Sequence, residues 1–153
     1  MPFFAILWPT FALVGLILVV WFSLIVARLG HIKRNPPGAE DFATGSAAMR
    51  YFEPVEMPAN NLRNLFEMPI LYFALVPLLL LTTSVTPAQV GLAWAFVILR
   101  ALHSLIHIGA NNVKRRFFAY LLSVVVLSAM WIGFAVDMCV ASADYANAMA
   151  HLY

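Results

Sequence analysis

The chain alternates long apolar runs with short stretches that hold nearly all of its charges. Residues 1–27 and 117–136 contain no charged side chain, and neither does the run from 68 to 99. An apolar helix of about 20 residues is long enough to cross the hydrocarbon core of a bilayer. The run from 68 to 99 is too long for one span. The stretch from Thr82 to Pro87 predicts a turn inside it, because proline suits the first turn of a new helix.

This pattern predicts an all-α integral membrane protein. Residues 1–153 are expected to form a single domain, a four-helix bundle with four membrane spans. The short turn between the second and third spans makes them an antiparallel hairpin. Pro69 and Pro77 predict a kinked or weakly hydrogen-bonded second span, because proline has no backbone N–H. The expected spans are residues 3–28, 61–83, 87–110 and 116–139, with a loop at 29–60.

Composition supports the membrane assignment and excludes other classes. Hydrophobic residues make up 63% of the chain, charged residues make up 10%, and the mean hydropathy is +0.88. A soluble globular chain has about 25% charged residues, and a disordered chain has low hydrophobicity. The net charge of +2 is too small to indicate nucleic acid. Cys139 is the single cysteine, so an internal disulfide framework and a cysteine-rich metal site are excluded.

The basic residues predict the orientation of the bundle. All nine lie in or beside the loops after the first and third spans. The N-terminal segment, the second loop and the C-terminal tail have none. The positive-inside rule therefore places both basic loops in the cytoplasm and both termini outside. The nine residues are Arg28, Lys33, Arg34, Arg50, Arg63, Arg100, Lys114, Arg115 and Arg116.

Two polar clusters lie at the cytoplasmic ends of the second and third spans. In the first, the spacing places Asn60, Asn64 and Glu67 on one helix face, with Arg63 beside it. The second cluster follows one helix face at steps of 3, 4, 4 and 3. Ionisable side chains inside a span usually face a bundle interior or a water-filled cavity. The second cluster contains Arg100, His103, His107, Asn111 and Lys114.

Three interpretations of these clusters stay open. The polar side chains can pair with one another and hold the helices together, with the arginines at the span ends as interfacial anchors. His103, His107 and Glu67 offer three metal ligands, but Arg100 one turn away disfavours a bound cation, so we expect no metal site. The excess of cations over carboxylates, with amide side chains among them, favours a pocket for a small polar ligand that bears carboxylates.

At these clusters the sequence resembles a known family. Arg63-Asn64-Leu65-Phe66-Glu67, followed by Pro69, resembles the second-helix motif of the membrane-associated proteins in eicosanoid and glutathione metabolism, the MAPEG family. The segment from Arg100 to His107, with Arg116 at the start of the fourth span, resembles the third-helix motif. The family includes microsomal glutathione transferases, leukotriene and prostaglandin E synthases, and a non-enzymatic lipid-binding member. We expect a bacterial-type member that resembles a microsomal glutathione transferase.

The resemblance implies a homotrimer with active sites between neighbouring subunits, each holding glutathione as a cosubstrate. Arg116 is the expected catalytic residue, which stabilises the glutathione thiolate, with Lys114 and Arg115 as alternatives. Arg28 is expected to reach in from the neighbouring subunit. At His107 active relatives often have tyrosine; histidine also donates a hydrogen bond, with a different geometry and pKa. The expected glutathione-binding residues are Arg28, Arg63, Asn64, Glu67, His103 and His107.

The implied function is either transfer of glutathione to a lipophilic electrophile or glutathione-dependent reduction of a lipophilic peroxide. In both cases the substrate approaches from the bilayer. The alternative is a non-catalytic lipid-binding or scaffold subunit, which uses the same fold to hold a lipid or a partner membrane protein, because a fold alone does not establish catalysis. We expect membrane lipids and a lipophilic small molecule as partners, and no nucleic acid. The resemblance and the short chain favour the bacterial inner membrane, with periplasmic N- and C-termini.

Overall fold

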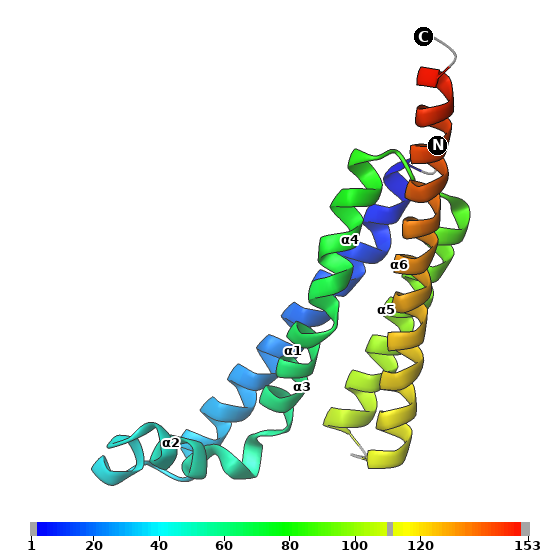
Figure 1. Ribbon diagram of the computed structural model, residues 1–153. Helices are drawn as coiled ribbons and strands as arrows, with labels where there is room; N and C mark the ends of the chain where they lie inside the picture. Colours follow the sequence, from blue (N-terminus) through cyan, green and yellow to red (C-terminus); the bar gives the residue numbers. More distant parts are fainter. Residues whose placement is uncertain (1–2, 110–111, 151–153) are drawn as a thin grey trace.

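The computed structural model describes residues 3–109 and 112–150, and these residues form only helices and their connections (Figure 1). Asn111, which the sequence assigns to the second polar cluster, lies outside the described residues. The all-α prediction is confirmed, and so is an integral membrane protein. The helices long and apolar enough to cross a membrane are Phe4–Arg34, Met57–Leu81, Pro87–Ile108 and Val113–Ala150.

The first span comprises a short 3-10 helix, η1 (Phe3–Ile6), and α1 (Leu7–Arg34). α1 continues beyond residue 28 because no proline follows until Pro36, which disfavours helical geometry at the residue before it. Its last turn holds His31, Lys33 and Arg34. Basic groups at that end interact favourably with the negative end of the helix dipole.

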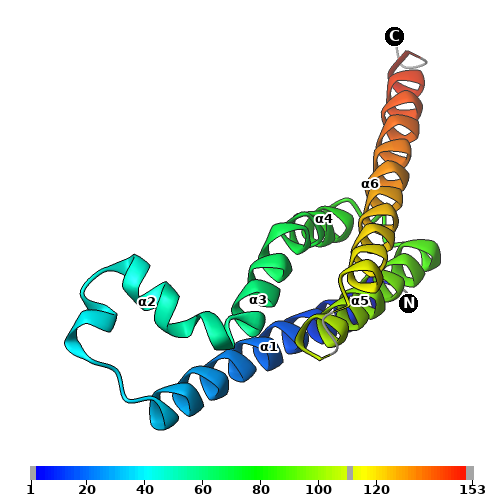
Figure 2. The ribbon, with the colours of Figure 1, turned by 90° about the horizontal axis from the view of Figure 1, so that it is seen from below.

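Residues 35–56 form an elbow that projects from one end of the bundle (Figures 1 and 2). Thr44 precedes its longest helix in an extended conformation, and the Thr44 side-chain oxygen accepts a hydrogen bond from the Ala47 N–H. This is the usual geometry of a helix N-cap. The Tyr51 ring lies 4.9 Å from the His31 ring, which joins the elbow to α1. The elbow contains η2 (Ala39–Phe42), α2 (Gly45–Phe52) and η3 (Glu53–Val55).

A break at Met68 divides the second span into α3 (Met57–Glu67) and α4 (Pro69–Leu81). Pro69 causes the break, because it has no N–H to donate and its ring presses against the carbonyl four residues earlier. Figure 2 shows the change of direction between the two helices. Pro77 lies inside α4 and does not end it. The break leaves carbonyls in the last turn of α3 that need partners outside the helix.

A tight turn joins α4 to α5 (Pro87–Ile108). Thr83 has a left-handed φ of 55°. The Thr83 N–H donates to the carbonyl of Leu80, and the Ser84 N–H donates to that of Leu79, at 3.2 and 2.9 Å. These two bonds form a Schellman motif, which satisfies carbonyls at a helix end. The chain reverses here, where the sequence pattern predicts a turn.

Like α1, two other helices extend beyond the spans that the sequence predicts. α3 begins four residues before 61, because Pro58 is suited to a first helical turn. α6 (Val113–Ala150) continues past 139 and reaches beyond the ends of the other helices (Figure 1). Its last part is rich in alanine, the strongest helix former.

The apolar core lies where α1, α4, α5 and α6 meet. Tyr72 stacks on Phe96 with ring centroids 5.3 Å apart, and its hydroxyl lies 3.0 Å from the Thr10 hydroxyl. Gln89 Nε2 donates a 3.0 Å hydrogen bond to the carbonyl of Met130, which joins α5 to α6. Polar groups in a span need such partners, since lipid offers none. Many large apolar side chains on the outer surface are exposed, as a lipid-facing surface requires.

Candidate functional site

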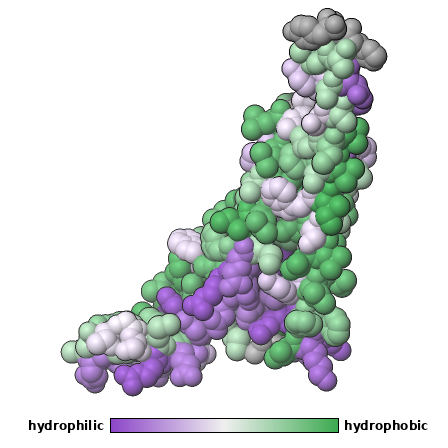
Figure 3. Space-filling model, in the orientation of Figure 1, coloured by the Kyte–Doolittle hydropathy of each residue, from purple (hydrophilic) through white to green (hydrophobic). Residues whose placement is uncertain are grey.

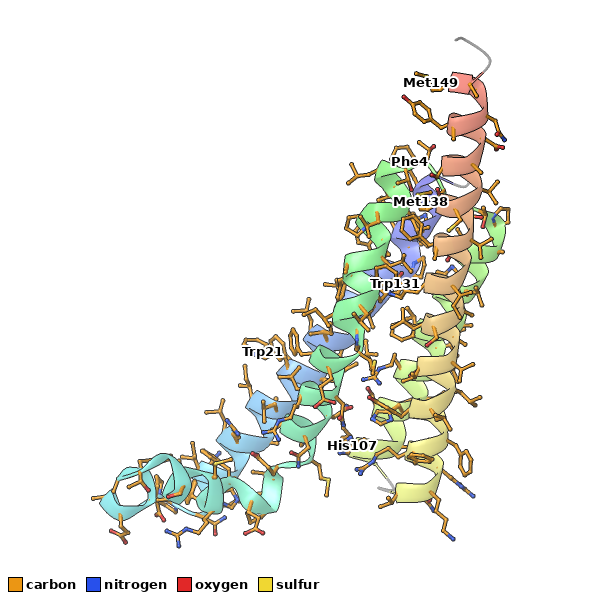
Figure 4. All side chains as sticks on the ribbon, viewed as in Figure 1. Phe4, Trp21, His107, Trp131, Met138 and Met149 are labelled. Carbon is orange, nitrogen blue, oxygen red and sulfur yellow. The ribbon has the colours of Figure 1, made fainter. Side chains whose placement is uncertain are left out.

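A cavity of about 460 Å³ lies at the end of the bundle where α3 begins, α5 ends and α6 begins. We call this end the basic end and this space the polar cavity. Hydrophilic side chains gather there on the face in Figure 3, and Figure 4 shows His107 at the same end. The polar cavity is lined by Met57, Asn60, Arg63, Asn64, Glu67, His107, Val113 and Arg116.

α3 forms one wall of the polar cavity because its residues divide into two faces. Asn61 and Leu65 are fully buried against the other helices. Arg63 and Glu67, on the other face, are exposed and line the polar cavity together with the half-buried Asn64. A spacing of three or four residues keeps such side chains on one side of a helix.

α5 and the first turn of α6 form the opposite wall. The chain reverses after Ile108, so that the start of α6 lies beside the end of α5. The Asn112 side-chain oxygen accepts a 3.1 Å hydrogen bond from the Arg115 N–H, which caps the first turn of α6. Arg116 in this turn and His107 in the last turn of α5 both line the polar cavity.

The structure brings five of the predicted site residues to this cavity. These are Arg63, Asn64, Glu67, His107 and Arg116.

Two other predicted site residues lie elsewhere in the chain. His103 is one turn before His107 and lines an adjoining cavity. Arg28 lies at the elbow, where its Nη2 is 3.3 Å from Glu56 Oε2 and its guanidinium is 4.7 Å from the centre of the Phe52 ring. Within its own chain, Arg28 therefore ties α1 to the elbow.

The adjoining cavity has a volume of about 240 Å³ and is more apolar; we call it the aromatic cavity. It shares Asn64, Val113 and Arg116 with the polar cavity, and adds Phe117 and Tyr120. These two aromatic residues are not among the site residues that the sequence predicts. A signal was present, because Tyr120 follows Arg116 by four residues and so lies on the same face of α6. Arg116 therefore lies between the polar cavity and the more apolar aromatic cavity.

The charges and free polar atoms of the polar cavity fit a ligand that carries more negative than positive charge. Its lining has two guanidinium groups, on Arg63 and Arg116, and one carboxylate, on Glu67. His107 Nδ1 is buried and has no hydrogen-bond partner within the described part of the chain. A buried polar atom without a partner is costly, so a ligand that supplied one would be stabilised there.

The two histidines of α5 lie close to each other and to the first turn of α6. His103 Nδ1 lies 3.1 Å from the carbonyl oxygen of Arg116, and the His103 and His107 rings meet edge to face at 5.6 Å. No group of three or more metal-ligating side chains occurs among residues 3–109 and 112–150. The guanidinium groups beside the pair disfavour a cation.

The fold and the site together define a class of protein: a helical membrane protein with a cationic, amide-lined cavity at one end of its bundle. The model of the MAPEG family matches residues 6–136, and the chain belongs to this family. The matched region contains every residue that lines the two cavities and ends before the last part of α6. Comparison with curated proteins and with solved structures found no match.

Proposed function

We propose that this protein is a membrane-embedded glutathione-dependent transferase or peroxidase that acts on lipophilic electrophiles. The observation that carries the proposal is the pair of joined cavities, one polar and cationic and one aromatic, with Arg116 between them. Glutathione carries two carboxylates, one ammonium group and one thiol. Two guanidinium groups, one carboxylate and two amide side chains in the polar cavity complement these groups.

The proposed chemistry uses the ligand's own thiol. A guanidinium favours the thiolate over the thiol, and the thiolate is the nucleophile. The thiolate attacks an electrophilic carbon, a carbon–sulfur bond forms, and the leaving group departs with the bonding electron pair. In this proposal Arg116 stabilises the thiolate, while Arg63, Asn64, Glu67 and His107 hold the rest of the tripeptide. His103 would contact it from the aromatic cavity.

We expect the purified protein to form a thiolate with bound glutathione and to conjugate glutathione to a lipophilic aryl halide. The measurements are the ultraviolet absorbance of the bound thiolate and the rate of conjugate formation in detergent or nanodiscs. Glutathione binding without thiolate or conjugate would favour the alternative, a non-catalytic lipid-binding or scaffold subunit. No binding of glutathione would contradict the proposal.

The proposed assembly is a homotrimer in which neighbouring subunits complete the polar cavity. The polar cavity in one chain is open, and a single bundle has little interior in which to enclose it. Arg28 of a neighbouring subunit would complete this opening; within its own chain Arg28 contacts Glu56. We expect light scattering in detergent to give the mass of three chains. A monomer that binds glutathione with full affinity would contradict this assembly.

The proposed location is the bacterial inner membrane, with the basic end in the cytoplasm. Every Lys and Arg lies in or beside the two loops at that end, which is the asymmetry that the positive-inside rule describes. Both termini would then be periplasmic. Glutathione would enter the polar cavity from the cytoplasm, and the electrophile would reach the aromatic cavity from the bilayer.

A further inference from the structure

Another cavity of about 460 Å³ lies between α1 and α5, on a different face of α5 from the polar cavity. The two helices diverge toward the basic end, and the cavity occupies the space that opens between them (Figures 1 and 2). Its walls are formed by residues of α1 between 16 and 23 and by residues of α5 between 101 and 109. We call it the apolar groove.

The side chains of the apolar groove are aliphatic apart from two serines, and both serine hydroxyls already donate within the chain. Ser23 Oγ donates to the carbonyl of Val20 at 2.7 Å, and Ser104 Oγ donates to Asn61 Oδ1 at 3.2 Å. Among residues 3–109 and 112–150, none that carries a charge lines the groove. A polar ligand would lose its hydrogen bonds to water there without replacement, so the groove fits an apolar occupant.

The apolar groove opens toward the hydrocarbon core of the bilayer. Both of its walls belong to helices that are long and apolar enough to cross a membrane. Val19 and Leu105, one from each wall, are largely exposed. At this depth the surrounding medium is lipid, and a lipid chain in the groove would make packing contacts that an empty space does not offer.

A cation lies beyond the groove on the same face of α1. Arg34 follows Leu16 by five full helical turns, so the two side chains leave α1 in the same direction. Arg34 is exposed, and its Nε donates to the Gly30 carbonyl at 3.0 Å, which directs the side chain back toward the groove. Gly30 lies about 10 Å beyond Ser23 along the axis of α1.

This spacing fits a phospholipid. The polar region between hydrocarbon and water is about 5–8 Å thick on each side of a bilayer. Because α1 runs obliquely to α6 (Figure 1), the distance from Ser23 to Gly30 corresponds to a smaller depth. A lipid with an acyl chain in the apolar groove would therefore have its phosphate near the Arg34 guanidinium, and these two groups form paired hydrogen bonds.

We propose that the apolar groove binds one acyl chain of an anionic phospholipid, whose phosphate is held by Arg34. Lys114 and Arg115 are exposed just beyond the end of α5 and favour a headgroup with a net negative charge over a zwitterionic one. The helix of a second copy is about 10–12 Å wide with its side chains, too wide to enter this groove. The lipid site does not depend on the proposed function, because it lies outside the polar cavity.

Lipid retention measures whether the groove is occupied. The full-length protein is placed in nanodiscs with equal amounts of phosphatidylglycerol and phosphatidylcholine and then extracted in a mild detergent. Native mass spectrometry counts the phospholipids that stay bound. We expect about one phosphatidylglycerol per chain, retained about fivefold more often than phosphatidylcholine.

Ala101→Phe tests the acyl-chain site. Ala101 lines the apolar groove and is half-buried, so a phenylalanine there would fill part of the space. We expect Ala101→Phe to retain about fivefold less phospholipid than the unsubstituted protein. Ala129→Phe is the matched control, because Ala129 is exposed in α6 and does not line the groove. It should retain as much phospholipid as the unsubstituted protein.

Arg34→Gln tests the phosphate site without any change in helix packing, since Arg34 is exposed. We expect this variant to lose the preference for phosphatidylglycerol over phosphatidylcholine. Lys33→Gln is the matched control: it removes the same charge one residue earlier, about 100° around α1. The preference should be unchanged in Lys33→Gln.

Three results would overturn the lipid site. Equal retention in Ala101→Phe, Ala129→Phe and the unsubstituted protein would show that no chain lies in the groove. Equal loss of preference in Arg34→Gln and Lys33→Gln would show that general charge, and not a phosphate on Arg34, attracts the lipid. An unsubstituted protein that retains no phospholipid, with an assembly that dissociates in Ala101→Phe, would show that a second copy covers the groove.

Discussion

Replacement of Arg116 by alanine is expected to lower the rate of glutathione conjugation by about ten- to a hundredfold. A charge-assisted contact contributes about 1.5–3 kcal/mol, and each 1.36 kcal/mol changes a rate about tenfold. Arg116 lines both cavities, so its guanidinium is the cation best placed to act on a thiolate at their junction. The pKa of bound glutathione's thiol should rise in Arg116→Ala, as measured by titration of the thiolate absorbance.

Arg116→Lys separates thiolate stabilisation from membrane anchoring. A lysine reaches the membrane interface as well as an arginine does, so an anchoring role predicts little change. The planar donor fork of arginine is not reproduced by lysine, so a thiolate-binding role predicts a rate close to that of Arg116→Ala. Arg115→Ala is the control, because Arg115 is exposed in the same turn and lines neither cavity. If the thiol pKa of bound glutathione is equal in the unsubstituted protein and in all three variants, Arg116 does not stabilise the thiolate. Lys114 or another cation would then do so.

Replacement of Glu67 by glutamine is expected to weaken glutathione binding by about tenfold. Among the residues that the structure describes, Glu67 is the only carboxylate in the lining of the polar cavity. It is therefore the group suited to receive the ligand's ammonium, and one charge-assisted hydrogen bond accounts for a change of this size. Glutamine keeps the shape of the side chain and removes its charge, so the assembly should be retained. The measurements are equilibrium binding and light scattering.

Glu40→Gln is the matched control for Glu67→Gln. Glu40 lies in the elbow, is exposed, and does not line either cavity. The same change of charge at this position should leave glutathione affinity unaltered. If Glu67→Gln binds as tightly as the unsubstituted protein, Glu67 only stabilises the helices, and the ammonium group of the ligand is held elsewhere.

The location of the candidate site follows from the sequence to a considerable extent. The steps of three and four residues at Asn60, Arg63, Asn64 and Glu67 place polar groups on one helix face, and α3 has that face. The antiparallel order of the spans then places this cluster at the same end as His107. The helical spacing of polar residues and the order of the spans are both properties of the sequence, so they can be derived from it.

The hydrogen-bond and ion-pair partners of individual side chains do not follow from the sequence. Arg28, His103 and Arg100 are all cationic or polar residues near the basic end, and the pattern offers no way to rank them. In the structure Arg28 binds Glu56, while Arg100 and His103 bond backbone carbonyls. Backbone acceptors have no signature in a sequence, because every residue has a carbonyl. The break that leaves such carbonyls without partners in α3 does have a signature in the sequence, because Pro69 causes it.

The sequence by itself determined that this chain is an all-helical membrane protein with polar clusters at one end, because hydropathy and helical period depend only on the order of residues. Only the tertiary structure decided which polar residues face the cavity and which hold the helices that form it. Arg100 and His107 share one stripe of α5, yet Arg100 is buried at the end of α3 and His107 lines the polar cavity. The difference arises because neighbouring helices bury both side chains, but the Arg100 guanidinium ends at a backbone carbonyl of α3, whereas His107, two turns further along α5, borders the space between α3 and α6.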